Sequence, residues 1–341
     1  MLLANNEDYN KQEILNELLK GSGVVVVKDV YSSEDIEITR NIINEFASNQ
    51  EQKESHFNAE AEASGKIHLQ QRVWNLFGKG AIFGKLISHD VIFDLMSSFL
   101  GTEFTCGSYC ASRLMPGAPG QELHIDYPYW DYYKKDTFPM GLNSSFPQNC
   151  QATIPLDICS ELSGATAYVP GSQKNLHYPN DKDDFSNQKQ MTANPGDLVL
   201  FNGNCWHGAS PNNSDHQRAV LLIEFLPKYI KPVEDLVTYL DDNFKKNCPD
   251  RVKQLLGLKY KYPKIMDVSK TVNDIGLGYK AKYIFMKNIG VIGCGNILET
   301  YLRSQEYFNN INFVSCSDIN MDLAKKTASE NNLKAQTVEE L

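Results

Sequence analysis

Apolar residues in the first hundred positions recur at the spacing of amphipathic helices. The segments with this helical spacing are residues 14–19, 32–46 and 81–100. The second begins with a Ser-Ser-Glu-Asp capping signal, and the third ends at Gly101, a common stop residue. Four consecutive valines, Val24–Val27, predict a short buried strand between the first two helices. The polar residues 50–66 predict a loop.

From residue 104 to 227 the pattern changes to short alternating or apolar runs. The runs of strand length and composition are residues 104–114, 121–127, 150–156, 166–169, 198–201 and 219–226. Turn residues separate them at 116–120, 170–172, 194–197 and 210–214. Many short strands with long loops and flanking helices predict a mainly β, α+β fold with a double-stranded β-helix (jelly-roll) core.

Beyond Pro227 the pattern returns to helical segments, near residues 233–244 and 251–256. Residues 286–298 then predict a strand, a glycine turn and a helix start, and a second strand at 312–317 ends at Asp318. These elements predict a partial Rossmann-like βαβα segment for the tail. The expected boundaries are 1–262 for the β domain, 263–285 for a linker and 286–341 for the incomplete Rossmann-like segment.

Charge and composition narrow the class of partner. The formal net charge of -9 and the pI near 5.3 argue against nucleic acid and against a membrane surface, because those partners are held by clustered Lys and Arg. The N-terminus has no signal-like segment, and no apolar run approaches the roughly 18–20 residues of a spanning helix. We expect a cytoplasmic protein that acts on a small molecule, and the oligomeric state stays open.

Eight cysteines are scattered along the chain without a C-x-x-C pair. In a chain of 341 residues this usage is typical of free thiols in a reducing compartment. We expect them to be small buried side chains.

The segment around residues 121–130 carries the candidate chemistry. His124 and Asp126 are two residues apart, so both side chains leave the same face of an extended strand. His207 is the best candidate for a third, distant ligand. Two His and one carboxylate on one face of a metal are typical of non-haem Fe(II) oxygenases.

Arg218 is the candidate anchor for a second ligand. A hairpin centred on Asn212-Asn213 would place His207 opposite Arg218. An arginine inside a barrel is costly unless it meets an anion, and its planar fork suits a carboxylate. A dicarboxylate cosubstrate that chelates iron at one end would satisfy both groups.

Four segments in this order resemble the phytanoyl-CoA dioxygenase family of Fe(II)/2-oxoglutarate-dependent oxygenases. They are residues 23–30, 116–126, 163–172 and 195–218, within a region of roughly residues 20 to 230. The sequence departs from the family's pattern at Gln173, where a His is usual, and at Ser163, where an Asn is usual. Neither position is a metal ligand, so the departures concern the substrate pocket.

The resemblance implies roles for five residues. The family's iron ligands correspond to His124, Asp126 and His207, and its 2-oxoglutarate-binding Arg to Arg218, eleven residues after the distal His. These four residues form the implied catalytic set. Thr153 falls where the family often places a side chain against 2-oxoglutarate.

The implied reaction consumes 2-oxoglutarate and O2 at Fe(II), releases succinate and CO2, and hydroxylates an unactivated C–H bond of a small metabolite. Asp126 favours hydroxylation, because halogenating members lack this carboxylate and bind chloride in its place. The alternative is a cupin-like protein that holds a metal without oxygenase turnover, although Arg218 at its spacing speaks against it. A third hypothesis is a nicotinamide oxidoreductase that acts through the tail.

Two groups of residues could contact the substrate. Five aromatic residues could form a lid over the site or belong to ordinary core: Tyr127, Tyr129, Trp130, Tyr132 and Tyr133. Arg72 and Arg113 could meet an anionic substrate group or be solvated or ion-paired.

The tail resembles the start of a Gfo/Idh/MocA-type NAD(P)-dependent oxidoreductase. Leu298 occupies the third glycine position of the fingerprint. The chain stops at Leu341 after two predicted strands, whereas a doubly wound fold needs about five or six. We therefore expect a fused or truncated remnant of a neighbouring enzyme.

Overall fold

The structure is a computed structural model. It describes residues 1–49, 61, 63–126, 147–175, 177–259, 287–304 and 311–341. The chain divides into two compact units, Met1–Tyr260 and Lys261–Leu341. The predicted division into a dioxygenase domain, a linker and an incomplete Rossmann-like segment stays a prediction, and the linker lies outside the described residues.

The first unit is built on a seven-stranded sheet, here called the major sheet. Its strand order is β1-β2-β8-β5-β10-β4-β3. The strands are β1 (Leu2–Asn5), β2 (Val24–Lys28), β3 (Gln70–Val73), β4 (Thr105–Leu114), β5 (Cys150–Pro155), β8 (Leu198–Asn202) and β10 (Arg218–Leu226). β1 and β2 are parallel, and the other neighbours are antiparallel. β10 therefore lies inside the sheet, hydrogen-bonded on both edges.

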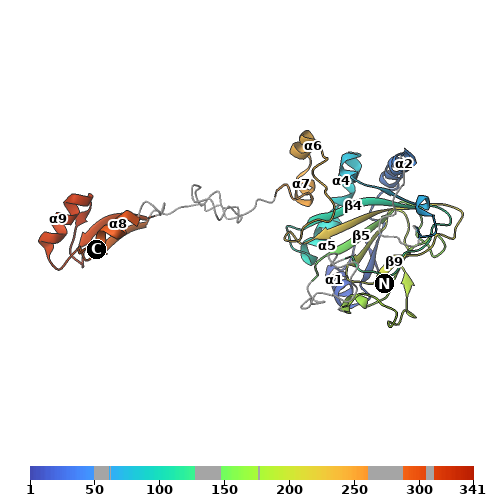
Figure 1. Cartoon of the computed structure of the whole chain (residues 1–341), viewed down its shortest axis with the longest axis horizontal. Coiled ribbons are helices and arrows are strands. Elements are labelled where there is room, and N and C mark those ends of the chain that lie inside the picture. The colour runs from blue at the N-terminus through green and yellow to red at the C-terminus, as the bar shows by residue number, and fades with distance from the viewer. Residues whose placement is uncertain (50–60, 62, 127–146, 176, 260–286, 305–310) are drawn as a thin grey trace. The chain divides into compact units, whose positions relative to one another are not determined.

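Helices cover one face of the major sheet and form the largest hydrophobic core with it. They are α1 (Lys11–Lys20), α2 (Ser33–Asn49), α4 (Ala81–Ile87), α5 (Asp90–Phe99), α6 (Asp242–Asn247) and α7 (Asp250–Leu255). The 3-10 turns are η1 (Ile67–Leu69), η2 (Leu76–Gly78) and η3 (Ser172–Lys174), of which η2 contributes to this core. The predicted cap of α2 is present, since the amide of Asp35 donates to Ser32 Oγ. Figure 1 shows α2 and α4 on one side of β4 and β5, and β9 on the other.

The opposite face carries a smaller sheet, the minor sheet. Its order is β7 (Lys189–Gln190), β6 (Thr166–Tyr168) and β9 (His207–Ala209). Tyr168 and Met191 pack against Val199 and Phe201 of the major sheet. The mixed α+β class with a large antiparallel sheet is thus confirmed, and the jelly-roll core and Rossmann-like tail stay predictions.

Successive side chains of β10 point alternately to the helix-covered core and to the opposite face of the major sheet. Ala219, Leu221 and Ile223 belong to the core beneath the helices. Because successive side chains alternate, Arg218 and Glu224 point to the face that carries the minor sheet, here called the site face. Both are buried.

The predicted hairpin between residues 207 and 218 is wrong. β9 pairs with β6 in the minor sheet, whereas β10 pairs with β4 and β5 in the major sheet. The connection through Asn212 crosses from one sheet to the other, and the Asn212 side chain donates to the carbonyls of Leu114 and His216. Arg218 is consequently opposite Leu114, not His207.

Three element predictions also need correction. The helical block 81–100 is two helices, because the His89 side chain caps α5 by accepting from the Val91 amide. Residues 233–241 are not helical. The run at 121–127, described through Asp126, forms only an isolated bridge at His124.

A buried carboxylate joins the start of β8 to the end of β2. Asp197 is 1% exposed and accepts from Lys28 Nζ (2.8 Å), from the amide of Asp29 (3.1 Å) and from the amide of Asn194 (2.8 Å). The neighbouring Gly196 has φ +93°, and a Cβ there would lie 2.8 Å from the Tyr31 carbonyl oxygen, so the turn requires glycine.

Asp197→Ala is expected to lower the free energy of unfolding by roughly 2–4 kcal/mol, because three donors lose their acceptor in a buried setting. Urea denaturation measures the loss. Asp181→Ala on the exposed surface is the matched control and should change it little. Equal stability of the two variants would contradict this account of the turn.

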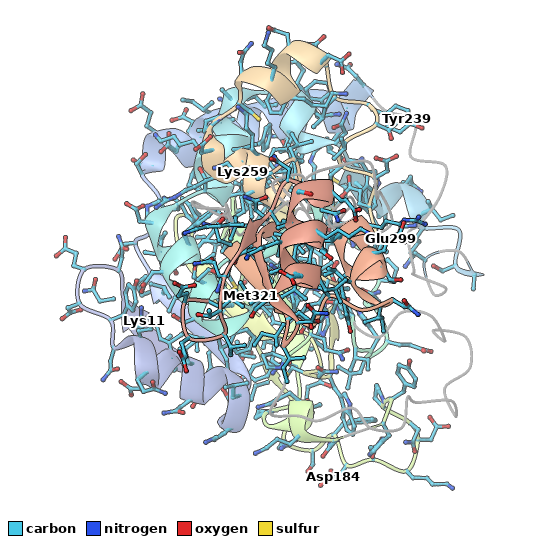
Figure 2. The ribbon with its side chains drawn as sticks, turned by 90° about the vertical axis from the view of Figure 1, so that its left-hand side faces the viewer. Lys11, Asp184, Tyr239, Lys259, Glu299 and Met321 are labelled. Atoms are coloured by element: carbon cyan, nitrogen blue, oxygen red, sulfur yellow. The ribbon has the colours of Figure 1, made fainter. Side chains whose placement is uncertain are left out.

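The second unit is a three-stranded parallel sheet with its own small core. The strands are β11 (Lys287–Ile292), β12 (Ile311–Ser317) and β13 (Lys334–Ala335), in that order. Helices α8 (Leu298–Ser304) and α9 (Met321–Asn331) connect them, and Figure 2 labels Glu299 on α8 and Met321 on α9. The amide of Cys294 donates to Asp318 Oδ2 (2.7 Å).

All eight cysteines are free and buried, as predicted. None of the helices in the described ranges has both the length and the apolar composition of a membrane span.

Candidate functional site

Backbone pairing brings the three predicted ligands together. The amide of His124 donates to the carbonyl of His207 (2.8 Å), and the amide of His207 donates back to His124 (3.0 Å). The two residues thus form an isolated antiparallel bridge. The amide of Asp126 donates to the Gly203 carbonyl (3.1 Å), in the turn between β8 and β9.

The three side chains converge on one point. His207 Nε2 lies 3.2 Å from Asp126 Oδ2, and His124 Nε2 lies 3.7 Å from Asp126 Oδ1. The ligand atoms of all three lie within 4.8 Å of one another. Two imidazoles and a carboxylate form a donor set that suits a divalent transition metal.

Backbone carbonyls fix the tautomer of both histidines. His124 Nδ1 lies 2.8 Å from the Glu122 carbonyl oxygen, and His207 Nδ1 lies 2.8 Å from the Cys205 carbonyl oxygen. Because a carbonyl can only accept, each Nδ1 carries the hydrogen, which leaves each Nε2 as a lone-pair donor. Both lone pairs therefore face Asp126.

The electrostatics of the group favour metal binding. Burial and the neighbouring His207 lower the pKa of His124 to about 4, so its ring is neutral at neutral pH. Burial alone would lower the pKa of His207 and raise that of Asp126. The attraction between the two outweighs burial, so the pKa of His207 rises and that of Asp126 falls. A divalent cation would take the place of the proton that this pair attracts.

Arg218 is a buried cation at the other end of the site face. It is 4% exposed, and its Nη2 donates to the Gly164 carbonyl. Its Nε is buried and has no hydrogen-bond partner among the described residues. Burial lowers the pKa of Arg218, and the nearby Arg72 lowers it further. An anion would therefore be stabilised there.

Thr153 lies between the triad and Arg218 along the site face. It is 8% exposed and pairs with Val199 on β8 and Leu222 on β10. Phe201 lies two residues beyond Val199 on β8, in the direction of the triad, and its ring centroid lies 4.8 Å from that of His207. Thr153 thus shares the face with both groups.

The residues expected near the substrate differ in where they lie. The positive charge of Arg72 on β3 contributes to lowering the pKa of His124, Asp126 and Arg218, so it acts on both ends of the site face. Arg113 instead donates to Gln217 and Gln71. The five aromatic residues of the predicted lid, Tyr127, Tyr129, Trp130, Tyr132 and Tyr133, lie outside the described residues.

The sequence profile of the phytanoyl-CoA dioxygenase (PhyH) family matches residues 19–220, more than half of the chain. The chain belongs to this family. Its members are Fe(II)- and 2-oxoglutarate-dependent dioxygenases, which agrees with the predicted enzyme class and its cofactors Fe(II), 2-oxoglutarate and O2. The resemblance of the tail to a Gfo/Idh/MocA-type enzyme stays a prediction.

Several curated fungal proteins are similar to the PhyH region. Dioxygenase ALT11 of Alternaria alternata is 29% identical over 151 residues, 44% of this chain and 47% of that protein. Dioxygenase af480 of Aspergillus fumigatus is 23% identical over 55% of this chain and 59% of its own length. Dioxygenase cdmA of Talaromyces verruculosus is 29% identical over 67% and 77%. The chain thus spans about half the length of the first two relatives.

A crystal structure of HygX from Streptomyces hygroscopicus, with nickel, 2-oxoglutarate and hygromycin B bound, is also similar. It aligns over 66% of this chain and 90% of that one, with 12% identity and a TM-score of 0.48.

Proposed function

We propose that this PhyH-family chain is an Fe(II)/2-oxoglutarate dioxygenase that hydroxylates an unactivated C–H bond of a small metabolite and releases succinate and CO2. The observation that carries the proposal is the convergence of two Nε2 lone pairs and one carboxylate within 4.8 Å. We further propose that the two facing sheets form the double-stranded β-helix that holds this group. Activity and substrate rest on the family together with this geometry.

In this proposal His124, Asp126 and His207 hold the iron. Their donor set fits a 2-His-1-carboxylate centre, which leaves positions for a chelating cosubstrate and O2. The carbonyls of Glu122 and Cys205 hold the rings by their Nδ1 hydrogens, so no rearrangement is needed before the metal binds.

Arg218 would bind the distal carboxylate of 2-oxoglutarate. Its buried Nε without a described partner supports this role, because an anion there would satisfy both the charge and the open donor. Thr153, on the same face, would donate its hydroxyl hydrogen to the cosubstrate.

Iron with 2-oxoglutarate supplies the oxidative chemistry when both are bound. The chain's own contribution is orientation and exclusion of water. Arg218 and Thr153 fix the cosubstrate at one end, and the triad fixes the reacting end. Val220 and Leu222 line the site face between them, which keeps that part of the surface apolar.

A small-molecule assay separates this proposal from a cupin-like metal-binding protein without turnover. The purified protein with Fe(II), 2-oxoglutarate and O2 should form succinate slowly, and a true substrate should raise that rate. Small metabolites screened as mixtures would be read by succinate release and a product mass increase of one oxygen. Metal binding without succinate under every condition would favour the cupin-like alternative.

Removal of the residues after Phe285 should leave succinate formation unchanged, because every proposed site residue lies in the first unit. Calorimetry of NAD(H) binding to the full chain and to the shortened chain tests the nicotinamide hypothesis on the same two proteins. Loss of oxygenase turnover on truncation would contradict the assignment of the site to the first unit.

A further inference from the structure

A buried acid lies on the site face and has no assigned role in the proposed reaction. Glu224 is 2% exposed and pairs across the sheet with Gln151 on β5. Gln151 in turn pairs with Phe201 on β8, and the pair Leu222 and Thr153 lies two residues further along β10 and β5. A buried carboxylate is costly unless it is hydrogen-bonded, so its contacts indicate what it supports.

Asn149 connects this acid to the turn between β8 and β9. Asn149 is fully buried, and its Nδ2 donates to Glu224 Oε1 (3.2 Å). A Cβ built on Gly203 would lie 1.7 Å from Asn149 Oδ1. Gly203 is not in the left-handed region, so space and not backbone conformation requires glycine here. The Asn149 amide thus rests directly on the Gly203 backbone.

The same turn holds two of the proposed metal ligands. The Gly203 carbonyl accepts from the amide of Asp126 (3.1 Å), and the Cys205 carbonyl lies 2.8 Å from His207 Nδ1. The turn is closed by the Cys205 amide, which donates to Asn202 (2.8 Å). A shift of the turn would therefore move the backbone of Asp126 and the ring of His207 together.

We propose that Glu224 and Asn149 are positioning residues that support the β8–β9 turn and thereby set the geometry of the metal ligands. The Glu224 carboxylate orients the Asn149 amide, and the amide packs against Gly203 and so fixes the position of its backbone. This inference rests on the proposed metal site and adds two supporting residues to it.

The test is a titration of the apoprotein with Co(II) alone. Binding is measured from the visible d–d absorption of the bound Co(II) and by calorimetry. Glu224→Ala removes the acceptor of the Asn149 amide, and Asn149→Ala removes the amide itself. Each should raise the Co(II) dissociation constant by about tenfold or more, the range typical of lost outer-shell support, and alter the absorption band. Glu234→Ala is the matched control, because Glu234 accepts from Ser108 Oγ (3.0 Å) and the Tyr109 amide (2.9 Å) on β4. It should change thermal stability but not the Co(II) constant.

A double variant tests the contact itself. Gly203→Ala places a methyl group against the Asn149 amide and should weaken Co(II) binding more than Asn149→Ala does. Combining the two changes removes the clash, so the double variant should return to the affinity of Asn149→Ala. This comparison stays informative if a single variant is unstable.

The outcomes are distinct. Wild-type Co(II) binding with unchanged constants in Glu224→Ala and Asn149→Ala would overturn this inference and leave the proposed function standing. Failure of the folded wild type to bind Co(II) would contradict the proposed metal site, and the inference with it. Weaker binding in both variants, with Glu234→Ala unaffected, is the expected result.

Discussion

Asp126→Ala is expected to lower 2-oxoglutarate-dependent succinate formation by at least about 10²-fold, because the change removes the one anionic ligand of the proposed centre. The carboxylate also attracts a cation at His207, as the raised pKa of His207 indicates. Its loss should weaken Fe(II) binding as well as turnover. Succinate formation and Fe(II) affinity should be measured in chloride-free buffer, since chloride could fill the vacated position.

Asp215→Ala is the control for this change, because that carboxylate is exposed and pairs only locally with His216. It should leave both quantities unchanged. If Asp126→Ala kept wild-type turnover while folded, another residue would have to complete the metal site.

Arg218→Ala is expected to raise the KM for 2-oxoglutarate by about 10²-fold, since truncating one partner of a buried charge pair costs about 2–5 kcal/mol. The rate at saturating 2-oxoglutarate should fall much less, because the iron ligands are intact. Arg218→Lys should lie between wild type and Arg218→Ala, since lysine keeps the charge but loses the planar fork. Initial rates of succinate formation over a range of 2-oxoglutarate give both parameters.

Arg113→Ala is the matched control from the neighbouring strand. Arg113 is opposite Ala219 on β10 and donates to two glutamines, so it lies away from the proposed cosubstrate. Its replacement should leave the KM for 2-oxoglutarate unchanged. A normal KM in Arg218→Ala would remove the cosubstrate anchor from the account.

Local patterns in the sequence were enough for several of the strands and for the proximity of His124 and Asp126. A run of β-branched residues such as Val24–Val27 favours a buried strand, and it forms β2. His124 and Asp126 share a face because they are two residues apart, whether or not a long strand forms around them. Their side chains do meet, at 3.7 Å.

Long-range pairing could not be derived in the same way. A turn at Asn212-Asn213 is consistent with a hairpin or with a crossing between sheets, and hydrophobic pattern does not distinguish them. The chain crosses, so His207 pairs with His124, 83 positions earlier, while Arg218 pairs with Leu114. The site is thus assembled from two sheets and not from one hairpin.

Asn149 and Glu224 were not predicted, and no signal in the sequence singles them out. An Asn before a strand and a Glu within an apolar strand are each compatible with surface positions. Only the fold shows that they meet across 75 positions and that Asn149 packs against Gly203.

The most direct test of the central claim is an anaerobic titration of the apoprotein with Fe(II) and then 2-oxoglutarate. The visible metal-to-ligand charge-transfer band of the chelate reports metal and cosubstrate in one site. We expect the band in the wild type, weakened or displaced in Asp126→Ala, and lost in Arg218→Ala at modest 2-oxoglutarate. A folded wild-type protein that binds iron but gives no band would contradict the dioxygenase site and favour a cupin-like protein that only holds the metal.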